Sequence, residues 1–121
     1  QDVEVLAVPG TGFVELVEQD LEATPEAEAC VRRVVEPLLD RGADRIVLGC
    51  THYPFLNPVF DRVIGGRDVR IVDPSPAVAR RVEQLLALHD LAASEDHAAT
   101  YDFRTFADEA YRRRLAAKAL G

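Results

Sequence analysis

Three reactive side chains stand together near the middle of the 121-residue chain: the thiol of Cys50, the hydroxyl of Thr51 and the imidazole of His52. They follow the apolar run 46–48 and Gly49. An apolar run without polar alternation is typical of a strand covered on both faces, as in a parallel sheet. A glycine at its end lets a ligand or another backbone come close. The pattern predicts that Cys50 lies at the carboxyl end of a central strand, where open α/β sheets place their ligands.

A cysteine beside a histidine in this position could act as a base or as a nucleophile. The thiolate is the reactive form of cysteine, and a neighbouring imidazole can pair with it or relay its proton. A cysteine taken alone is more often a small hydrophobic residue. Because Cys50 follows Gly49 and is close to His52, a functional role for Cys50 is as well supported as a purely structural one.

The segment Leu48-Gly49-Cys50-Thr51-His52-Tyr53-Pro54 resembles the signature around the second catalytic cysteine of the cofactor-independent aspartate/glutamate racemases. The His-Tyr-Pro triplet is typical of the glutamate racemases within that family. The resemblance extends to residues 13–18, which are similar to a family segment that ends in a functional glutamate, and to residues 72–75. It covers most of residues 3–90 and the tail only loosely.

The resemblance implies roles for four residues. Cys50 would be one of two catalytic bases and, with Thr51, would contact the substrate, whose carboxylate or amino group Thr51 would hold. His52 would assist Cys50, and Glu18 would orient or polarise His52. Without the resemblance, Glu18 is better interpreted as a surface residue, since glutamates are seldom buried. The family uses neither pyridoxal phosphate nor a metal, so no cofactor is expected.

The second base of the family lies in a Cys-Asn-Thr segment that is absent from this sequence. Cys30 is no substitute, because it belongs to an apolar stripe at helical spacing. The chain therefore resembles the carboxyl-terminal half of a glutamate racemase. Residues 1–66 would be the remainder of the lobe that carries Cys50, and residues 67–121 would return to the other lobe. The chain begins at Gln1, not methionine, and is expected to be a processed or cut piece.

The resemblance implies interconversion of L- and D-glutamate, which supplies D-glutamate for peptidoglycan and thereby serves cell wall biogenesis and cell shape. The expected partners are glutamate and the missing amino-terminal half of the enzyme, and a homodimer with a second copy is an open alternative. The isolated chain is expected to be inactive, because it holds only one base.

The composition indicates which binding partners and which cellular compartment suit the chain. The net charge of −7 and the pI near 4.9 argue against nucleic acids and anionic membranes as main partners, since both require concentrated Lys and Arg. Two cysteines without paired spacing indicate a reducing, cytoplasmic compartment and not a disulfide framework. No apolar run reaches transmembrane length, and no signal peptide is apparent.

Alternating strand and helix patterns predict an α/β fold, a three-layer parallel sheet with flanking helices that resembles the flavodoxin-like half-domains of the racemases. The capping residue Thr24, with Pro25 after it, predicts a helix start, Pro37 predicts a kink or a division of that helix, and Gly42 its end. Ser75 is expected to cap a later helix. The expected strands are residues 3–8, 45–50 and 69–72, with an edge strand at 100–106, and the expected helices are 13–18, 25–41, 55–64, 77–89 and 107–120.

Four other interpretations remain open at this point. The chain could be a non-catalytic fragment or binding module of the racemase superfamily. It could belong to an aspartate racemase or a racemase for another amino acid. Cys50 and His52 could bind a metal with His89 or His97, although Cys-x-His is not a recognised zinc spacing. They could also form the nucleophile pair of a thiol hydrolase.

Overall fold

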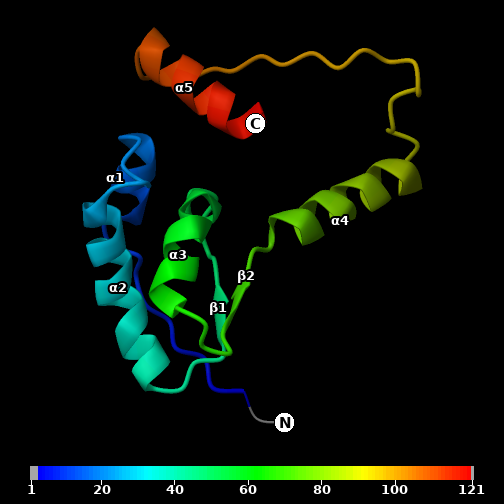
Figure 1. The fold of residues 1–121 in the computed structure, drawn as a ribbon. Coiled ribbons are helices and arrows are strands. Elements are labelled where there is room, and N and C mark those ends of the chain that lie inside the picture. The colour runs from blue at the N-terminus through cyan, green and yellow to red at the C-terminus, as the bar shows by residue number, and fades with distance from the viewer. Residues whose placement is uncertain (1–2, 121) are drawn as a thin grey trace. The chain divides into compact units, whose positions relative to one another are not determined.

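The computed structural model describes residues 3–120, which divide between Val82 and Glu83 into two compact units. The α/β class with a parallel sheet and flanking helices is confirmed (Figure 1). The elements in chain order are α1 (Phe13–Glu18), α2 (Pro25–Asp40), β1 (Arg45–Val47), the 3-10 helix η1 (Tyr53–Leu56), α3 (Asn57–Ile64), β2 (Arg70–Val72), α4 (Ser75–Leu88) and α5 (Glu109–Leu120).

The sheet of the first unit consists of β1 and β2, which pair in parallel with Ile46 opposite Ile71. The ladder continues past both ends of β1: the Leu48 amide donates to the Val72 carbonyl at 3.0 Å, and the Arg70 amide donates to the Asp44 carbonyl at 3.1 Å. The crossover from β1 to β2 runs through η1 and α3. This crossover places the turn after Gly49 at the carboxyl end of β1.

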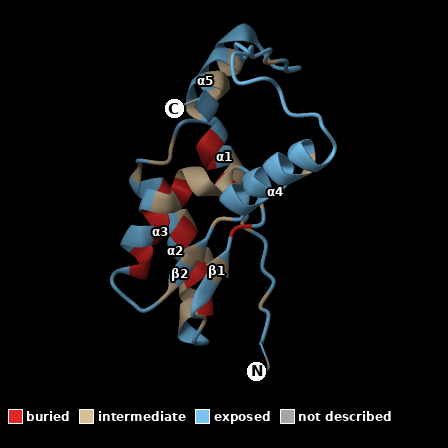
Figure 2. Cartoon of the chain, turned by 90° about the vertical axis from the view of Figure 1, so that its right-hand side faces the viewer, coloured by how far each residue is buried: buried red, intermediate tan, exposed pale blue. Residues whose placement is uncertain are grey.

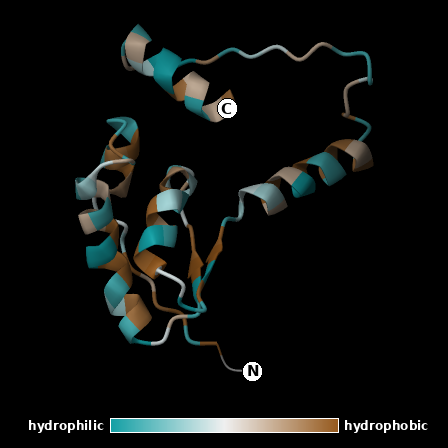
Figure 3. Cartoon of the chain, in the orientation of Figure 1, coloured by the Kyte–Doolittle hydropathy of each residue, from teal (hydrophilic) through white to brown (hydrophobic). Residues whose placement is uncertain are grey.

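The core of the first unit lies on one face of this sheet, where α2 and α3 pack. Figure 2 shows the buried residues on α1, α2 and α3, and Figure 3 shows the apolar residues of β1 and β2. The cluster comprises Phe13, Leu16, Val17, Ala27, Val31, Val35, Leu48, Leu56, Val59, Phe60, Val63 and Ile64. The helices predicted at 13–18, 25–41 and 55–64 thus supply the residues of this core.

The boundaries of α2 follow from local chemistry. The Thr24 hydroxyl accepts the Ala27 amide at 3.3 Å, and Pro25 is the first helical residue, as predicted. Gly42 ends the helix with φ of 82°, a conformation that favours glycine. The helix is not divided at Pro37, which lies on the exposed face, since the buried Val35 and Leu38 hold the last turn against the core.

Two predicted strands are wrong. Residues 3–8 and 100–106 carry no strand, because neither segment has a backbone ladder to a neighbour within the described residues. Residues 3–8 still run extended past β1, with an ion pair of 2.8 Å between Glu4 and Arg41 near their start. Their mostly apolar sequence favours a strand, but a strand also requires a partner at hydrogen-bonding distance.

The two later helices differ from the core helices in burial. α4 begins at Ser75, so Ser75 is its first residue and not its cap; the Asp73 carboxylate accepts the Ser75 amide at 2.8 Å. Hydrogen bonds from Ser75 lower the pKa of Asp73. Neither α4 nor α5 contains a buried residue, and Tyr111 and Leu115 of α5 are only partly buried. No helix within residues 3–120 combines the length and apolarity needed to cross a membrane.

Candidate active site

Cys50 lies three residues beyond the end of β1, in the turn that leads into η1. The ladder bond from Leu48 is the last to β2, and Gly49 then frees the chain to turn. The Tyr53 amide closes this turn by donating to the Cys50 carbonyl at 3.2 Å. The predicted placement of Cys50 at the carboxyl end of a parallel strand is confirmed, although the strand itself is shorter than the expected 45–50.

The three residues expected to act together form a chain of contacts. The Cys50 Sγ is 3.8 Å from His52 Nδ1, and His52 Nε2 is 3.5 Å from Glu18 Oε1. The imidazole therefore lies between the thiol and the carboxylate, with one ring nitrogen toward each. We refer to Cys50, His52 and Glu18 as the relay.

The relay is partly open to solvent. The side chains of His52 and Glu18 are 27% and 41% exposed, and Cys50 is of intermediate burial. Thr51, the fourth predicted site residue, is exposed beside Cys50 on the same turn. The Cys50 thiol and the Thr51 hydroxyl are therefore both accessible to a substrate from solvent.

Aromatic packing brings Glu18 to a histidine far from it in sequence. The ring of Phe13 at the start of α1 meets Tyr53 edge-to-face at 5.2 Å and Phe60 at 5.7 Å. Such pairs add to the stabilisation from burial alone. They fix α1 against η1 and α3, so that Glu18, the last residue of α1, faces the turn with His52.

The arrangement can move a proton. With the Nε2 proton directed at the Glu18 carboxylate, Nδ1 is the lone-pair nitrogen and can accept the thiol proton of Cys50. The carboxylate then stabilises the imidazolium that results, and the thiolate is free to act as a base. No group of three His, Cys, Asp or Glu side chains among residues 3–120 is placed to hold a metal ion.

Cys30 is separate from the relay. It packs partly buried against the core, and its Sγ donates to the Thr11 carbonyl at 3.4 Å, with Arg33 Nη2 at 3.6 Å. This placement agrees with its predicted membership in the apolar stripe of α2. Asp73, at the end of β2, is engaged by Ser75 at the start of α4.

Two glycines that the sequence does not identify as site residues, Gly10 and Gly12, lie next to the elements that carry the site. Gly10 approaches Tyr53 so closely that an added Cβ would lie 2.6 Å from the tyrosine oxygen. Gly12 caps α1 with φ of 90°. The signal was present in the glycine-rich segment 9–12, but it indicates close backbone approach without identifying the neighbour.

Comparisons with known proteins agree with this architecture. Residues 4–82 match the family described as Asp/Glu/Hydantoin racemase. A glutamate racemase of Pseudomonas putida is 43% identical over 94% of this chain and 43% of its own length. A glutamate racemase of Roseiflexus is 49% identical over 71% of this chain and 31% of its own.

A solved structure supports the same assignment. The glutamate racemase of Thermus thermophilus, crystallised with beta-chloro-D-alanine, superposes with a TM-score of 0.69 at 34% identity, over 90% of this chain and 41% of that one. The chain thus spans less than half the length of the relatives it matches. The family match covers most of the first unit, including the relay and both strands, and the chain belongs to the Asp/Glu/hydantoin racemase family.

Proposed function

We propose that this chain supplies one of the two bases of a cofactor-independent glutamate racemase. The relay of Cys50, His52 and Glu18 carries the proposal, since it provides a thiol with a proton acceptor in contact and a carboxylate behind that acceptor. The substrate assignment is supported by the relatives, which are named glutamate racemases and match 94% and 71% of this chain.

Racemisation requires removal of the α-proton of an amino acid and delivery of a proton to the opposite face of the α-carbon. In one direction the Cys50 thiolate takes the proton, while a second group donates from the other side. In the reverse direction Cys50 donates. Before Cys50 acts as the base, His52 takes the thiol proton, and the resulting imidazolium lies between the thiolate and the Glu18 carboxylate. Thr51 binds the carboxylate or amino group of glutamate, so that the α-carbon faces Cys50. Neither role requires a cofactor.

The second base comes from the part of the enzyme outside this chain. Cys30 does not supply it, since its thiol contacts Thr11 and the core side of α2. The complete enzyme would have two lobes, of which residues 1–66 belong to one and residues 67–121 to the other. It would work in the cytoplasm, alone or as a homodimer, and supply D-glutamate for peptidoglycan and cell shape.

The test follows D-glutamate formation by polarimetry for the 121-residue chain and for a complete enzyme that contains it. We expect no racemisation by the chain alone, because one thiol reaches one face of the α-carbon. In the complete enzyme, Cys50→Ser should lower the rate by about 10²- to 10⁴-fold, the usual contribution of a positioned acid or base.

Cys30→Ser in the same complete enzyme is the matched control and should retain activity. Racemisation by the short chain alone would overturn the two-base proposal. Full activity of Cys50→Ser would remove Cys50 from the mechanism.

A further inference from the structure

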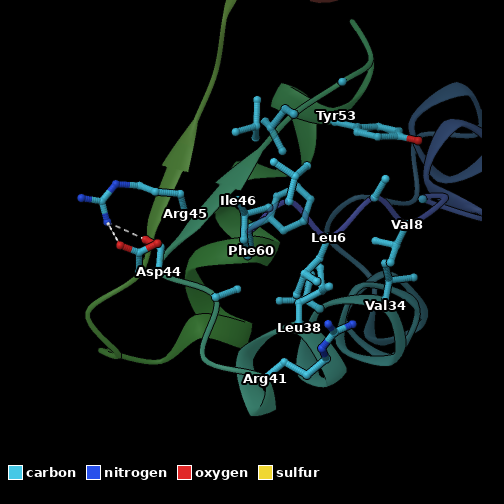
Figure 4. Close-up of a pocket in the computed structure, with 18 of the residues that line it drawn as sticks. Leu6, Val8, Val34, Leu38, Arg41, Asp44, Arg45, Ile46, Tyr53 and Phe60 are labelled. Carbon is cyan, nitrogen blue, oxygen red and sulfur yellow. Dashed lines mark hydrogen bonds and ion pairs between the residues drawn. The ribbon is translucent and has the colours of Figure 1, made fainter. Parts of the chain in front are cut away.

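The sheet of the first unit has an unoccupied slot along one edge. A cavity of about 870 Å³ lies between residues 3–8 and β1. Figure 4 shows Leu6 and Val8 on one side of it and Ile46 on the other, with Val34 and Leu38 of α2 among its lining residues. We call this space the strand slot.

The edge of β1 that faces away from β2 has unused hydrogen-bonding groups. The backbone groups of Asp44 and Leu48 point toward β2, as their hydrogen bonds to Arg70 and Val72 show. Because backbone groups alternate along a strand, those of Val47 point to the opposite edge. Among the described residues, no backbone hydrogen bond to the Val47 or Gly49 amide is found on that side. Unpaired backbone groups of this kind are a template for another strand.

Residues 3–8, which form the opposite wall of the strand slot, also lack a strand partner among the described residues. Residues 3–8 are extended and form no backbone ladder, although Glu4 is tied to Arg41 and Gly10 is packed against Tyr53. The segment is thus held at Glu4 and, just after its end, at Gly10, while the cavity separates it from β1. One missing strand between two others leaves a gap of about 9–10 Å, twice the usual strand separation.

The exposure of two apolar side chains also indicates that a part of the sheet is missing. Val47 is 66% exposed and Val5 is 81% exposed, although both lie in apolar stretches. The run 46–48 is typical of a strand that is buried on both faces, whereas α2 and α3 cover only one. The exposed valines mark surface that a further strand and its attached chain would cover.

We infer that the strand slot receives one apolar β-strand from the remainder of the racemase polypeptide. The strand pairs with β1 on one side and with residues 3–8 on the other, which converts both into members of one continuous sheet. Its length is about five residues, and its side chains are apolar on both faces, as in central parallel strands. The occupant is assigned to the same protein because this chain spans only 43% of its Pseudomonas putida relative.

This inference rests on the proposed function only in that the partner is the rest of the enzyme, and it is tested by binding without reference to racemisation. The 121-residue chain is co-expressed with the part of the Pseudomonas putida glutamate racemase that it does not cover. The two should co-purify, and hydrogen exchange at the Val47 and Gly49 amides should be slow in the complex and fast in the chain alone. The Leu48 amide, already bonded to Val72, is the internal control and should be slow in both.

A pair of variants isolates the backbone contact. Val47→Pro removes the slot-facing amide and should reduce the co-purified partner by about tenfold or more, as expected for a lost hydrogen bond with its buried acceptor unpaired. Val47→Thr keeps the amide and the branched shape at this exposed position, and it should bind as the wild type does.

Failure of the wild-type chains to co-purify would overturn the inference, as would a complex in which the Val47 amide still exchanges rapidly. A Val47 amide that is already slow in the isolated monomer would show that the slot is closed by the chain itself. Protection of that amide only in a dimer of this chain would assign the slot to a second copy, and would equally contradict the proposal.

Discussion

The thiols of Cys50 and Cys30 allow a comparison within one molecule. Cys50 lies 3.8 Å from an imidazole, whereas the Cys30 thiol, in the apolar stripe of α2, donates to the backbone carbonyl of Thr11. The thiolate is the form that reacts with alkylating reagents, and a neighbouring imidazole favours it. We therefore expect iodoacetamide to modify Cys50 faster than Cys30 near neutral pH, as followed by mass spectrometry of peptides.

His52→Ala should slow the modification of Cys50 and leave the rate at Cys30 unchanged, so that Cys30 serves as the control in the same sample. Equal rates at the two cysteines of the wild type would contradict the relay. A rate at Cys50 that does not change in His52→Ala would assign its reactivity to another group.

At the residue level, sequence reasoning found the contact between Cys50 and His52 because the two are close along the chain and share one turn. Glu18 was reached only through resemblance to a family. Its meeting with His52 depends on the packing of Phe13 against Tyr53 and Phe60, which joins three separate segments. No local pattern encodes that contact.

The start of α2 allows a prediction at the level of one element. The Thr24 hydroxyl accepts the Ala27 amide and donates to the Leu21 carbonyl at 2.7 Å. Thr24→Ala should therefore lower the free energy of unfolding by about 1 kcal/mol, measured by urea denaturation. Thr24→Ser keeps the hydroxyl and should lie much closer to the wild type. Equal losses in both variants would attribute the effect to the methyl group and not to the cap.

Helices were predicted better than strands for a physical reason. A helix is closed by hydrogen bonds within its own segment, so that Thr24, Pro25 and Gly42 mark its ends locally. A strand requires a neighbour, and residues 3–8 have a mostly apolar, strand-like sequence but no backbone ladder to a neighbour among the described residues. Pro37 failed to divide α2 because burial of the flanking residues outweighs one lost backbone bond.

At the level of the whole molecule, the division of residues between lobes stays a prediction. The contacts of the chain separate it between Val82 and Glu83, whereas the predicted lobe boundary falls between residues 66 and 67. The first division separates compact units within this chain by itself. The second is the predicted boundary between the lobes of a complete enzyme, which includes the part outside this chain. The sequence could predict an α/β fold, but not how the sheet is completed.

In the mechanism that we propose, Cys50 is one of two bases that face opposite sides of the α-carbon. The measurement is exchange of the α-proton of L- and D-glutamate with solvent in D₂O, followed by NMR, for a complete enzyme that contains this chain and for its Cys50→Ser variant. We expect the variant to lose racemisation but still to exchange the α-proton of one enantiomer with retention, through the remaining base. Exchange and inversion of both enantiomers at wild-type rates, or equal loss of exchange for both, would contradict it.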